Sequence, residues 1–295
     1  MGILKIAGIG ELLFDVLGDA EHLGGAPVNF ACHSESLGAQ GLVITSVGMD
    51  DRGARALNLL GQRGMGTQGI SVLDDYPTGF VSASLDQNGI ASYHFPDDVA
   101  WDHLKLTDHV RLTCSELHAV CFGSLGQRSP QSRQTILDFL NQLPPETLRV
   151  FDVNLRQNFY SREILVDSMK RCTILKLNDE ELPVIAEMLE LEGDDVTLLG
   201  RLVKRFALQL GILTRGGKGS LLVGADCESN HPGIPGEIVD TIGAGDAFTA
   251  AVTLGFLLKK SLEEINEHAN RVASWVCGQS GATPQLPEEL KLITD

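Results

Sequence analysis

The stretch VDTIGAGDAF, residues 239–248, places two glycines, several small residues and two acids directly before a predicted helix. Gly243 and Gly245 allow a ligand to approach the backbone closely. The following run AGDAFTAAVTLGFLLKK is typical of a helix, and its first N–H groups and dipole favour an anion at the turn. Asp246 falls in the first helical turn, either as a favourable acid at a helix N-terminus or as a carboxylate beside a bound anion. No G-K-[ST] follows the turn, so it is not a Walker A loop.

A carboxylate beside an anion site has a specific use in phosphoryl transfer. If the anion is the γ-phosphate of a nucleotide, Asp246 can accept the proton of an attacking alcohol. Backbone amides of the turn can stabilise charge on the transferred group, and this reaction depends mainly on positioning and charge stabilisation. The turn therefore indicates a kinase whose acceptor is an alcohol.

Size and charge limit the function classes. A chain of 295 residues suits one large α/β domain with a small appendage. The formal net charge of −16 argues against nucleic acid and anionic membrane as partners. The six cysteines form no C-x-x-C pair, which indicates reduced thiols, no zinc ribbon and a cytoplasmic location. No signal peptide is recognisable, and no apolar run approaches the roughly 20 residues that span a membrane.

Apolar runs alternate with helical segments along the chain. The runs ILKIAGIG, GLVITSVG, HAVCFGSL, LRVFDVNL and CTILKLN predict buried strands of a mostly parallel sheet covered by helices. Residues 77–96 differ, since two short alternating runs flank Asn88-Gly89, a strong hairpin signal. Ser129 is predicted to cap a helix that starts with Pro130, and Ser261 to form a capping box in a later helix. Polar motifs follow the strands, where sheets of this type bind ligands.

Seven motifs in one order resemble those of the PfkB, or ribokinase-like, carbohydrate kinases. VDTIGAGDAF resembles the C-terminal signature of that family, and the match extends from about residue 3 to residue 287. Within the family, the segments GELLFD, GGAPVN, YHFPDDVAWD and DVNLR resemble fructokinases. The other motifs are GMDDRG (48–53), NDEE (178–181), TRGGKG (214–219) and GATPQLP (281–287).

The resemblance implies a role for each matching residue. Asp246 is the general base, and the amides of Gly243, Ala244 and Gly245 form the anion hole. ATP and Mg²⁺ are the implied cofactors, with K⁺ as a further candidate, and residues 267–281 would cover the adenine. The remaining implied roles are sugar binding by Asp15, Gly25 and Asn29, nucleotide binding by Asn178, Thr214, Gly216, Gly219, Gly243 and Gly245, magnesium binding by Glu181 largely through water, and monovalent cation binding by Asp240 and the carbonyl of Ile242 near Gly281.

Several of these residues also have ordinary structural explanations. Asn29 either binds a sugar hydroxyl or caps a helix, and Asn178 with Glu181 matches a capping box as well as a magnesium motif. The string RGGKGS, taken alone, indicates a hairpin. If the chain stays extended after its strand, Asp152, Asn154 and Arg156 point the same way, with Arg156 the cation for substrate or phosphate.

The resemblance implies one kinase domain over residues 1–295, with a ribokinase-like central sheet and a small β-sheet lid. Segments of about 12–24 and 77–96 would form the lid, which closes over the sugar and excludes water. Because related kinases often dimerise through this sheet, we expect a homodimer, although the short 12–24 segment argues against a large interface.

The reaction that these residues predict is phosphorylation of D-fructose by ATP to fructose 6-phosphate. The alternatives are a kinase for ribose, 2-keto-3-deoxygluconate or a nucleoside, and a catalytically silent sugar-binding regulator. The intact Asp246 turn argues against the silent regulator. A dinucleotide-dependent oxidoreductase is disfavoured because the first strand lacks G-x-G-x-x-G.

Overall fold

A large sheet forms the centre of the molecule. The structure is a computed structural model that describes residues 2–18, 20–85 and 91–293. Within these residues the sheet has nine strands in the order β13-β12-β11-β10-β9-β8-β1-β4-β5, all parallel to their neighbours except β12 and β13. The strands are β1 (Lys5–Ile9), β4 (Gln40–Gly48), β5 (Ile70–Leu73), β8 (Ala119–Phe122), β9 (Leu148–Asp152), β10 (Ile174–Asn178), β11 (Leu210–Thr214), β12 (Ser220–Val223) and β13 (Glu228–His231).

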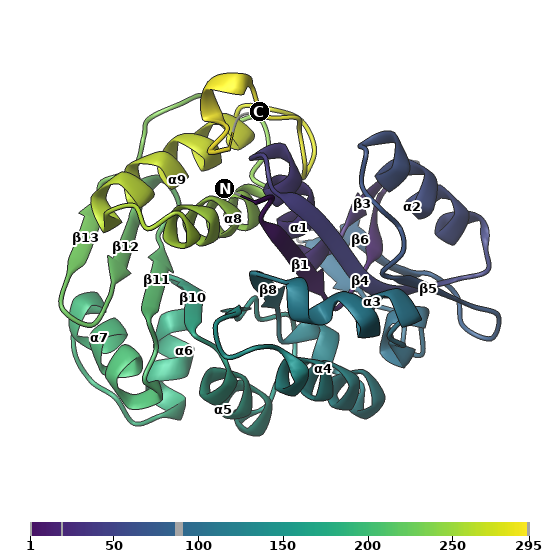
Figure 1. Ribbon diagram of the computed structural model, residues 1–295, viewed down its shortest axis with the longest axis horizontal. Coiled ribbons are helices and arrows are strands. Elements are labelled where there is room, and N and C mark those ends of the chain that lie inside the picture. The colour runs from purple at the N-terminus through teal and green to yellow at the C-terminus, as the bar shows by residue number, and fades with distance from the viewer. Residues whose placement is uncertain (1, 19, 86–90, 294–295) are drawn as a thin grey trace.

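Helices cover both faces of this sheet (Figure 1). One face carries α1, α2, α8 and α9, and the other carries α3 to α7. Strand β1 shows why both faces are needed, because Ile6 packs with α8 and α9 while Ile9 packs with α4 and α5. The helices are α1 (Ala26–Ser36), α2 (Asp51–Gln62), α3 (Asp108–Thr113), α4 (Pro130–Gln142), α5 (Arg162–Arg171), α6 (Glu181–Met188), α7 (Asp195–Phe206), α8 (Ala244–Leu257) and α9 (Leu262–Cys277).

A second, small sheet stands beside the main one, next to α2 in Figure 1. Its order is β3-β2-β6-β7, so the two segments predicted for the small sheet pair with each other through β2 and β6. The pair β6–β7 is the predicted hairpin, and its Asn88-Gly89 turn lies outside the described residues. The strands are β2 (Leu13–Leu17), β3 (Ala20–Gly24), β6 (Gly79–Leu85) and β7 (Ala91–His94).

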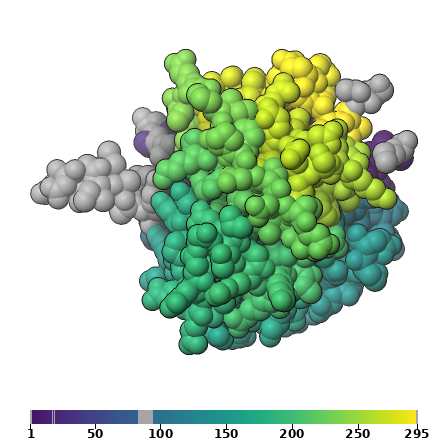
Figure 2. Space-filling model, turned by 90° about the vertical axis from the view of Figure 1, so that its left-hand side faces the viewer, coloured from purple at the N-terminus to yellow at the C-terminus, as the bar shows by residue number. Residues whose placement is uncertain are grey.

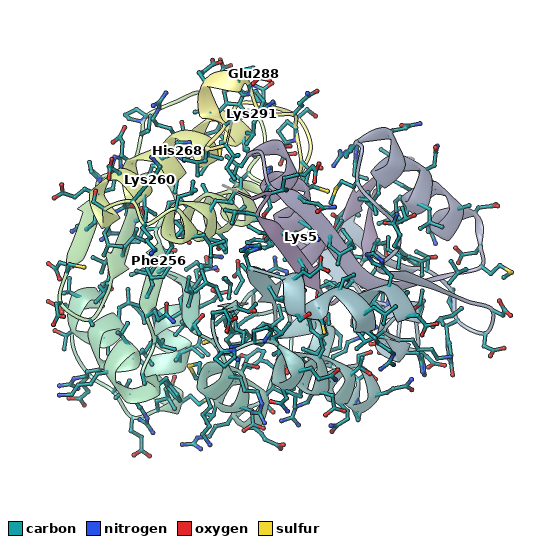
Figure 3. The ribbon with its side chains drawn as sticks, in the orientation of Figure 1. Lys5, Phe256, Lys260, His268, Glu288 and Lys291 are labelled. Atoms are coloured by element: carbon teal, nitrogen blue, oxygen red, sulfur yellow. The ribbon has the colours of Figure 1, made fainter. Side chains whose placement is uncertain are left out.

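The C-terminal segment folds back onto α9. His268 of α9 donates from Nε2 to the carbonyl oxygen of Leu290 at 2.9 Å, and Lys291 pairs with Glu288 in the same segment (Figure 3). Figure 2 shows the edge of the molecule where the green segments, residues of about 150–250, meet these yellow C-terminal elements. Among the described helices, none combines the length and the apolar character that a membrane crossing requires.

Candidate active site

The predicted anion turn has the backbone that its glycines suggested. Gly243 is the N-cap of α8 with φ 80°, a left-handed conformation that favours glycine. A Cβ at this position would overlap the carbonyl oxygen of Ala282, so the turn lies directly against the C-terminal segment. Gly245 and Asp246 follow in the first turn of α8, where backbone N–H groups have no intrahelical partner.

Asp246 is held at the mouth of this turn by α1. Its Oδ2 accepts a hydrogen bond of 2.8 Å from Nδ2 of Asn29. The pKa of Asp246 is raised to about 7, mainly by burial and secondly by the nearby Asp152 carboxylate, and the Asn29 hydrogen bond opposes both effects. A carboxylate with a pKa near neutrality is well suited to accept a proton at physiological pH.

Asn29 does not cap a helix, so that alternative is wrong. The N-cap of α1 is Gly25, and Asn29 lies one turn further along, 5% exposed. Its Nδ2 faces Asp246, and its buried Oδ1 has no hydrogen-bond partner among the described residues. The helix thus brings a polar side chain, rather than an apolar one, to the carboxylate predicted to act as base.

The glycine pair at residues 24–25 lies beside Asp15. A Cβ at Gly24 would overlap Oδ2 of Asp15, and Gly25 has φ 110°. Asp15 belongs to β2 of the small sheet, so its carboxylate meets the start of α1 from the predicted lid. Burial raises the pKa of Asp15, while the positive charge of Arg156 lowers it.

The predicted row of Asp152, Asn154 and Arg156 does not form. Strand β9 ends at Asp152, and Asn154 has φ 44°, which turns the chain out of the extended conformation. Asp152 is buried, whereas Arg156 is exposed. The charge of Arg156 still reaches the site, because it lowers the pKa of Asp15 and Asp246.

Asn178 and Glu181 form reciprocal capping hydrogen bonds. Asn178 Oδ1 accepts from the backbone N–H of Glu181 at 2.8 Å, and Glu181 Oε2 accepts from the N–H of Asn178 at 2.9 Å. Glu181 Oε1 accepts from the N–H of Leu155 at 3.0 Å. The reciprocal hydrogen bonds of a capping box are therefore present, but the N-cap of α6 is Glu180 rather than Asn178. Both carboxylate oxygens of Glu181 already have a backbone donor.

The second glycine turn joins β11 to β12. Thr214 ends β11, and its Oγ1 lies 3.4 Å from the carbonyl oxygen of Leu177. Gly216 and Gly219 have φ 54° and 82°, and a Cβ at Gly219 would overlap the carbonyl oxygen of His231. The string is thus a true glycine turn between antiparallel strands, at the same sheet edge as Asn178, which pairs with Thr214.

Asp240 links the loop before α8 to the C-terminal segment. Its Oδ1 accepts from the N–H of Ile242 at 3.0 Å and its Oδ2 from the N–H of Gly281 at 3.2 Å. The residues predicted for a monovalent cation site are therefore brought together. In the part of the chain that the structure describes, three or more His, Cys, Asp or Glu side chains nowhere gather as a metal site.

Comparison with known proteins identifies the family. Residues 11–289 match the pfkB family carbohydrate kinases. The chain belongs to this family. It is 32% identical to the sugar kinase PH1459 of Pyrococcus horikoshii, described as uncharacterized, over 97% of this chain and 94% of that protein. The structure of PH1459 in complex with ATP superposes with a TM-score of 0.82, covering 96% of each chain.

Two fructokinases are more distant relatives of this kinase. Fructokinase-2 of Zea mays is 24% identical over 96% of this chain and 91% of its own. A fructokinase of Vibrio cholerae, solved with fructose, ADP and potassium ion bound, has a TM-score of 0.80 at 19% identity, covering 97% of this chain and 96% of that one. At this identity the second likeness shows the shared ribokinase-like fold and no more.

Two charged residues at the candidate site were not singled out from the sequence. Glu11 follows β1 and is 1% exposed, and its Oε2 has no hydrogen-bond partner in the described part of the chain. Burial raises the pKa of Glu11 to about 7. Lys176 lies inside β10, and its Nζ donates to Asp152 Oδ1 at 3.0 Å. Burial alone would lower the pKa of Lys176, but the Asp152 carboxylate raises it above its usual value. The sequence signal for Lys176 was a single charged residue inside an otherwise apolar strand, ILKLN.

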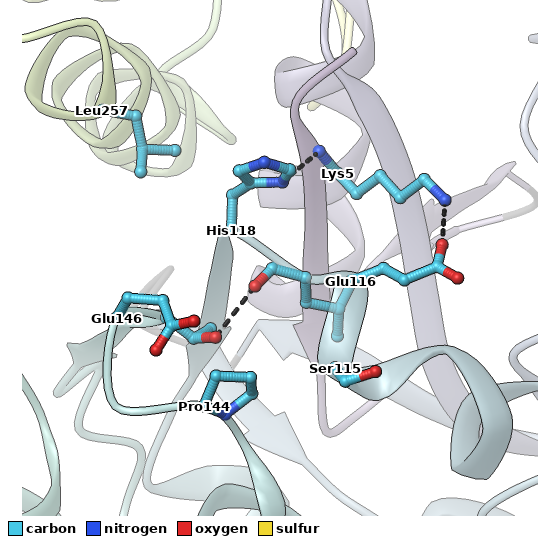
Figure 4. Close-up of a pocket in the computed structure, with 9 residues that line it drawn as sticks. Lys5, Ser115, Glu116, His118, Pro144, Glu146 and Leu257 are labelled. Carbon is cyan, nitrogen blue, oxygen red and sulfur yellow. Dashed lines mark hydrogen bonds and ion pairs between the residues drawn. The ribbon is translucent and has the colours of Figure 1, made fainter. Parts of the chain in front are cut away.

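A pocket of about 470 Å³ lies at the opposite edge of the sheet (Figure 4). Its lining includes Lys5, at the start of β1, and His118, just before β8. The two are joined by a hydrogen bond of 3.1 Å from the Lys5 backbone N–H to His118 Nδ1. Because the predicted kinase residues lie at the carboxyl ends of the strands and none lines this pocket, we do not assign the reaction to it.

Proposed function

We propose that this carbohydrate kinase transfers the γ-phosphate of ATP to D-fructose and forms fructose 6-phosphate. The observation that carries the proposal is the Asn29–Asp246 hydrogen bond of 2.8 Å, which fixes a carboxylate beside the glycine turn at the start of α8. ATP as donor is supported by the ATP complex of PH1459. Fructose is supported by the segments that resemble fructokinases and by the fructokinases among the relatives.

In the proposed phosphoryl transfer, Asp246 lies between the sugar-binding residues and the anion turn. The acceptor hydroxyl oxygen attacks the γ-phosphorus, its proton passes to Asp246, and the bond from the phosphorus to the ADP oxygen breaks. Amides of Gly243, Ala244 and Gly245 stabilise the negative charge on the transferred group. Asp15, Gly25 and Asn29 hold the sugar, while Arg156 supplies positive charge from the loop after β9.

We place the nucleotide at the turn between β11 and β12 and at the segment that follows β10. Thr214, Gly216 and Gly219 line the nucleotide, and Asn178 lies beside them. Magnesium, when bound, neutralises charge on the phosphates. Glu181 fits a role through water, because each of its oxygens already accepts a backbone hydrogen bond and Mg²⁺ keeps much of its hydration. A potassium site at Asp240 and the Ile242 carbonyl is proposed from the family resemblance, and Asp240 already joins Ile242 to Gly281 through backbone hydrogen bonds.

A sugar panel tests the proposal directly. ADP production is measured with Mg·ATP and fructose, ribose, glucose, 2-keto-3-deoxygluconate or adenosine, each with and without potassium. A kcat/KM for fructose that exceeds the others by more than about 10-fold, or ~1.4 kcal/mol of transition-state binding, supports the fructokinase assignment. Preference for another acceptor retains the mechanism and rejects fructose. Binding of ATP without turnover of any acceptor favours a silent regulator.

A further inference from the structure

Three buried polar side chains meet beneath the anion turn. They come from three elements: Asp152 ends β9, Lys176 lies in β10 and Thr249 lies in α8. Lys176 Nζ donates to Asp152 Oδ1 at 3.0 Å, and Thr249 Oγ1 donates to Asp152 Oδ2 at 3.2 Å. Their exposed fractions are 3% for Asp152, 7% for Lys176 and 0% for Thr249. We call these three residues the Asp152 cluster.

The cluster is joined to the first turn of α8 through Thr249. Thr249 Oγ1 also donates to the carbonyl oxygen of Gly245 at 2.8 Å, so its single hydroxyl proton is shared between that carbonyl and Asp152. Lys176 Nζ lies 3.6 Å from the position that a Cβ would take at Gly245. Gly245, which provides a predicted anion-hole amide, is therefore held by the Thr249 hydroxyl and lies close to the Lys176 ammonium group.

Fold stability alone gives a poor account of this arrangement. An ion pair buried in a sheet costs desolvation free energy, and well-packed apolar residues often replace such pairs without loss of stability. Lys176 lies inside the buried strand β10, and the carboxylates of Asp152, Glu181 and Asp246 all act on its ammonium group. The polar groups add directional hydrogen bonds. Such bonds restrict the position of the first turn of α8 relative to β9 and β10 more than apolar packing does.

We propose that the Asp152 cluster is a positioning device for phosphoryl transfer, which keeps the amides of the anion turn and Asp246 in place relative to the sheet. The proposal rests on the kinase function proposed above. The members of the cluster are positioning residues, because they act through Gly245 and the α8 backbone. A small displacement of such a turn lowers the catalytic rate, since misplacement by about 1 Å can reduce turnover by about 100-fold.

The chain contains a matched control for Thr249. Thr253 lies one turn further along α8, is also 0% exposed and donates from Oγ1 to the carbonyl oxygen of Thr249 at 2.7 Å. Thr249→Val removes a backbone hydrogen bond and the bond to Asp152, whereas Thr253→Val removes only the backbone bond. The two variants change the same atoms in the same buried helix and differ in the contact with the cluster.

Turnover of the full chain distinguishes positioning from simple packing. At a temperature where each variant is fully folded, Thr249→Val should lower kcat by about 10-fold, with KM for sugar and for ATP changed less than about 2-fold. Thr249→Ser should restore kcat to within about 2-fold of the parent protein, and Thr253→Val should stay at that level. Equal kcat values for the two valine variants would overturn the proposal.

A second measurement does not depend on turnover or on the identity of the sugar. Amide hydrogen exchange of residues 244–249, followed by mass spectrometry, should be faster in Thr249→Val than in the parent and unchanged in Thr253→Val. Equal exchange in the two variants would contradict the positioning role. If the parent protein phosphorylates no sugar of the panel, the proposed substrate fails, and the exchange result still decides the role of the cluster.

Discussion

At the residue scale, the proposed chemistry depends on the protonation of Asp246. Burial and Asp152 raise its pKa to about 7, while Asn29, Lys176 and Arg156 act in the opposite direction. The base must be ionised to accept a proton, so kcat/KM should be low below pH 6, rise through about pH 7 and reach a plateau above it. A pH profile of kcat/KM for the preferred sugar measures this limb.

Glu11 provides the control for that profile, because its pKa is also raised to about 7 by burial. Glu11→Gln removes the Glu11 titration, so an acidic limb that remains near pH 7 in this variant belongs to Asp246. Asp246→Asn should lower kcat by about 100- to 10,000-fold while ATP and sugar still bind. Near-normal turnover in Asp246→Asn would remove this residue from the role of base.

Asp246→Asn should lower turnover but increase the stability of the fold. A carboxyl whose pKa is higher in the folded than in the unfolded chain destabilises the fold as it ionises. For Asp246, with ordinary pKa 3.8 and folded pKa about 7, this cost grows between pH 4 and pH 7 and is constant above. Asp246→Asn should therefore raise the free energy of unfolding by about 1–3 kcal/mol at pH 8, with a gain that shrinks toward pH 4. Urea denaturation at both pH values measures the difference, and a loss of stability at pH 8 would contradict it.

At the element scale, the start of α8 depends on a glycine that has no room for a side chain. Gly243→Ala would drive a methyl group into the Ala282 carbonyl and strain a backbone at φ 80°. We expect turnover to fall by at least about 100-fold and Tm to fall by several degrees, which corresponds to roughly 1–3 kcal/mol. Steady-state kinetics and thermal unfolding measure both effects.

Gly61→Ala is the matched control for this substitution. Gly61 lies in α2, and a Cβ there would meet nothing within 4 Å. Alanine is the better helix former by about 1 kcal/mol, so this variant should keep its activity and gain slight stability. If both glycine variants retain activity, the close contact between the anion turn and the C-terminal segment is not needed for catalysis.

The elements themselves show what the sequence could and could not reveal. The apolar strands, the β6–β7 hairpin and the Ser261 capping box were predictable, because each has a local signal. Ser129 is the N-cap of α4 as predicted, but its hydroxyl donates to the carbonyl oxygen of Asp102 at 2.6 Å instead of capping the helix. Strand β13, ESNH, has a polar sequence and is defined only by its pairing with β12.

The site was predictable where a motif fixes local backbone, and less so where the fold brings distant residues together. Of the two glycines singled out in the anion turn, Gly243 has a positive φ and Gly245 does not. Asp152 is 97 residues from Thr249 in the chain, and no local pattern indicates that they touch. The predicted row of Asp152, Asn154 and Arg156 failed for a similar reason. Asn154 lies in the loop after β9 and has a left-handed conformation, which the strand pattern does not predict.

At the scale of the whole molecule, the two tryptophans lie at different parts of the kinase. Trp101 packs between the small sheet and the main body, in a cluster with Leu13 and Val81, and the Arg128 guanidinium lies 4.0 Å from its ring centroid. Trp275 lies in α9, in the segment predicted to cover the adenine. Movement of the small sheet relative to the body should therefore change the environment of Trp101 and leave that of Trp275 unchanged.

Single-tryptophan variants turn this arrangement into a test of lid closure. In Trp275→Phe, addition of the preferred sugar should change the emission of Trp101, and nucleotide alone should not. In Trp101→Phe, nucleotide should change the emission of Trp275, and sugar alone should have little effect. Trp101 is 1% exposed, so its replacement by the smaller Phe should cost roughly 1–3 kcal/mol of folding free energy, and the stability of this variant is checked first.

If Trp101 does not respond to a sugar that the enzyme phosphorylates, the small sheet does not act as a lid that closes over the acceptor. A response of both tryptophans to each ligand alone would instead show that the sugar and nucleotide halves close together.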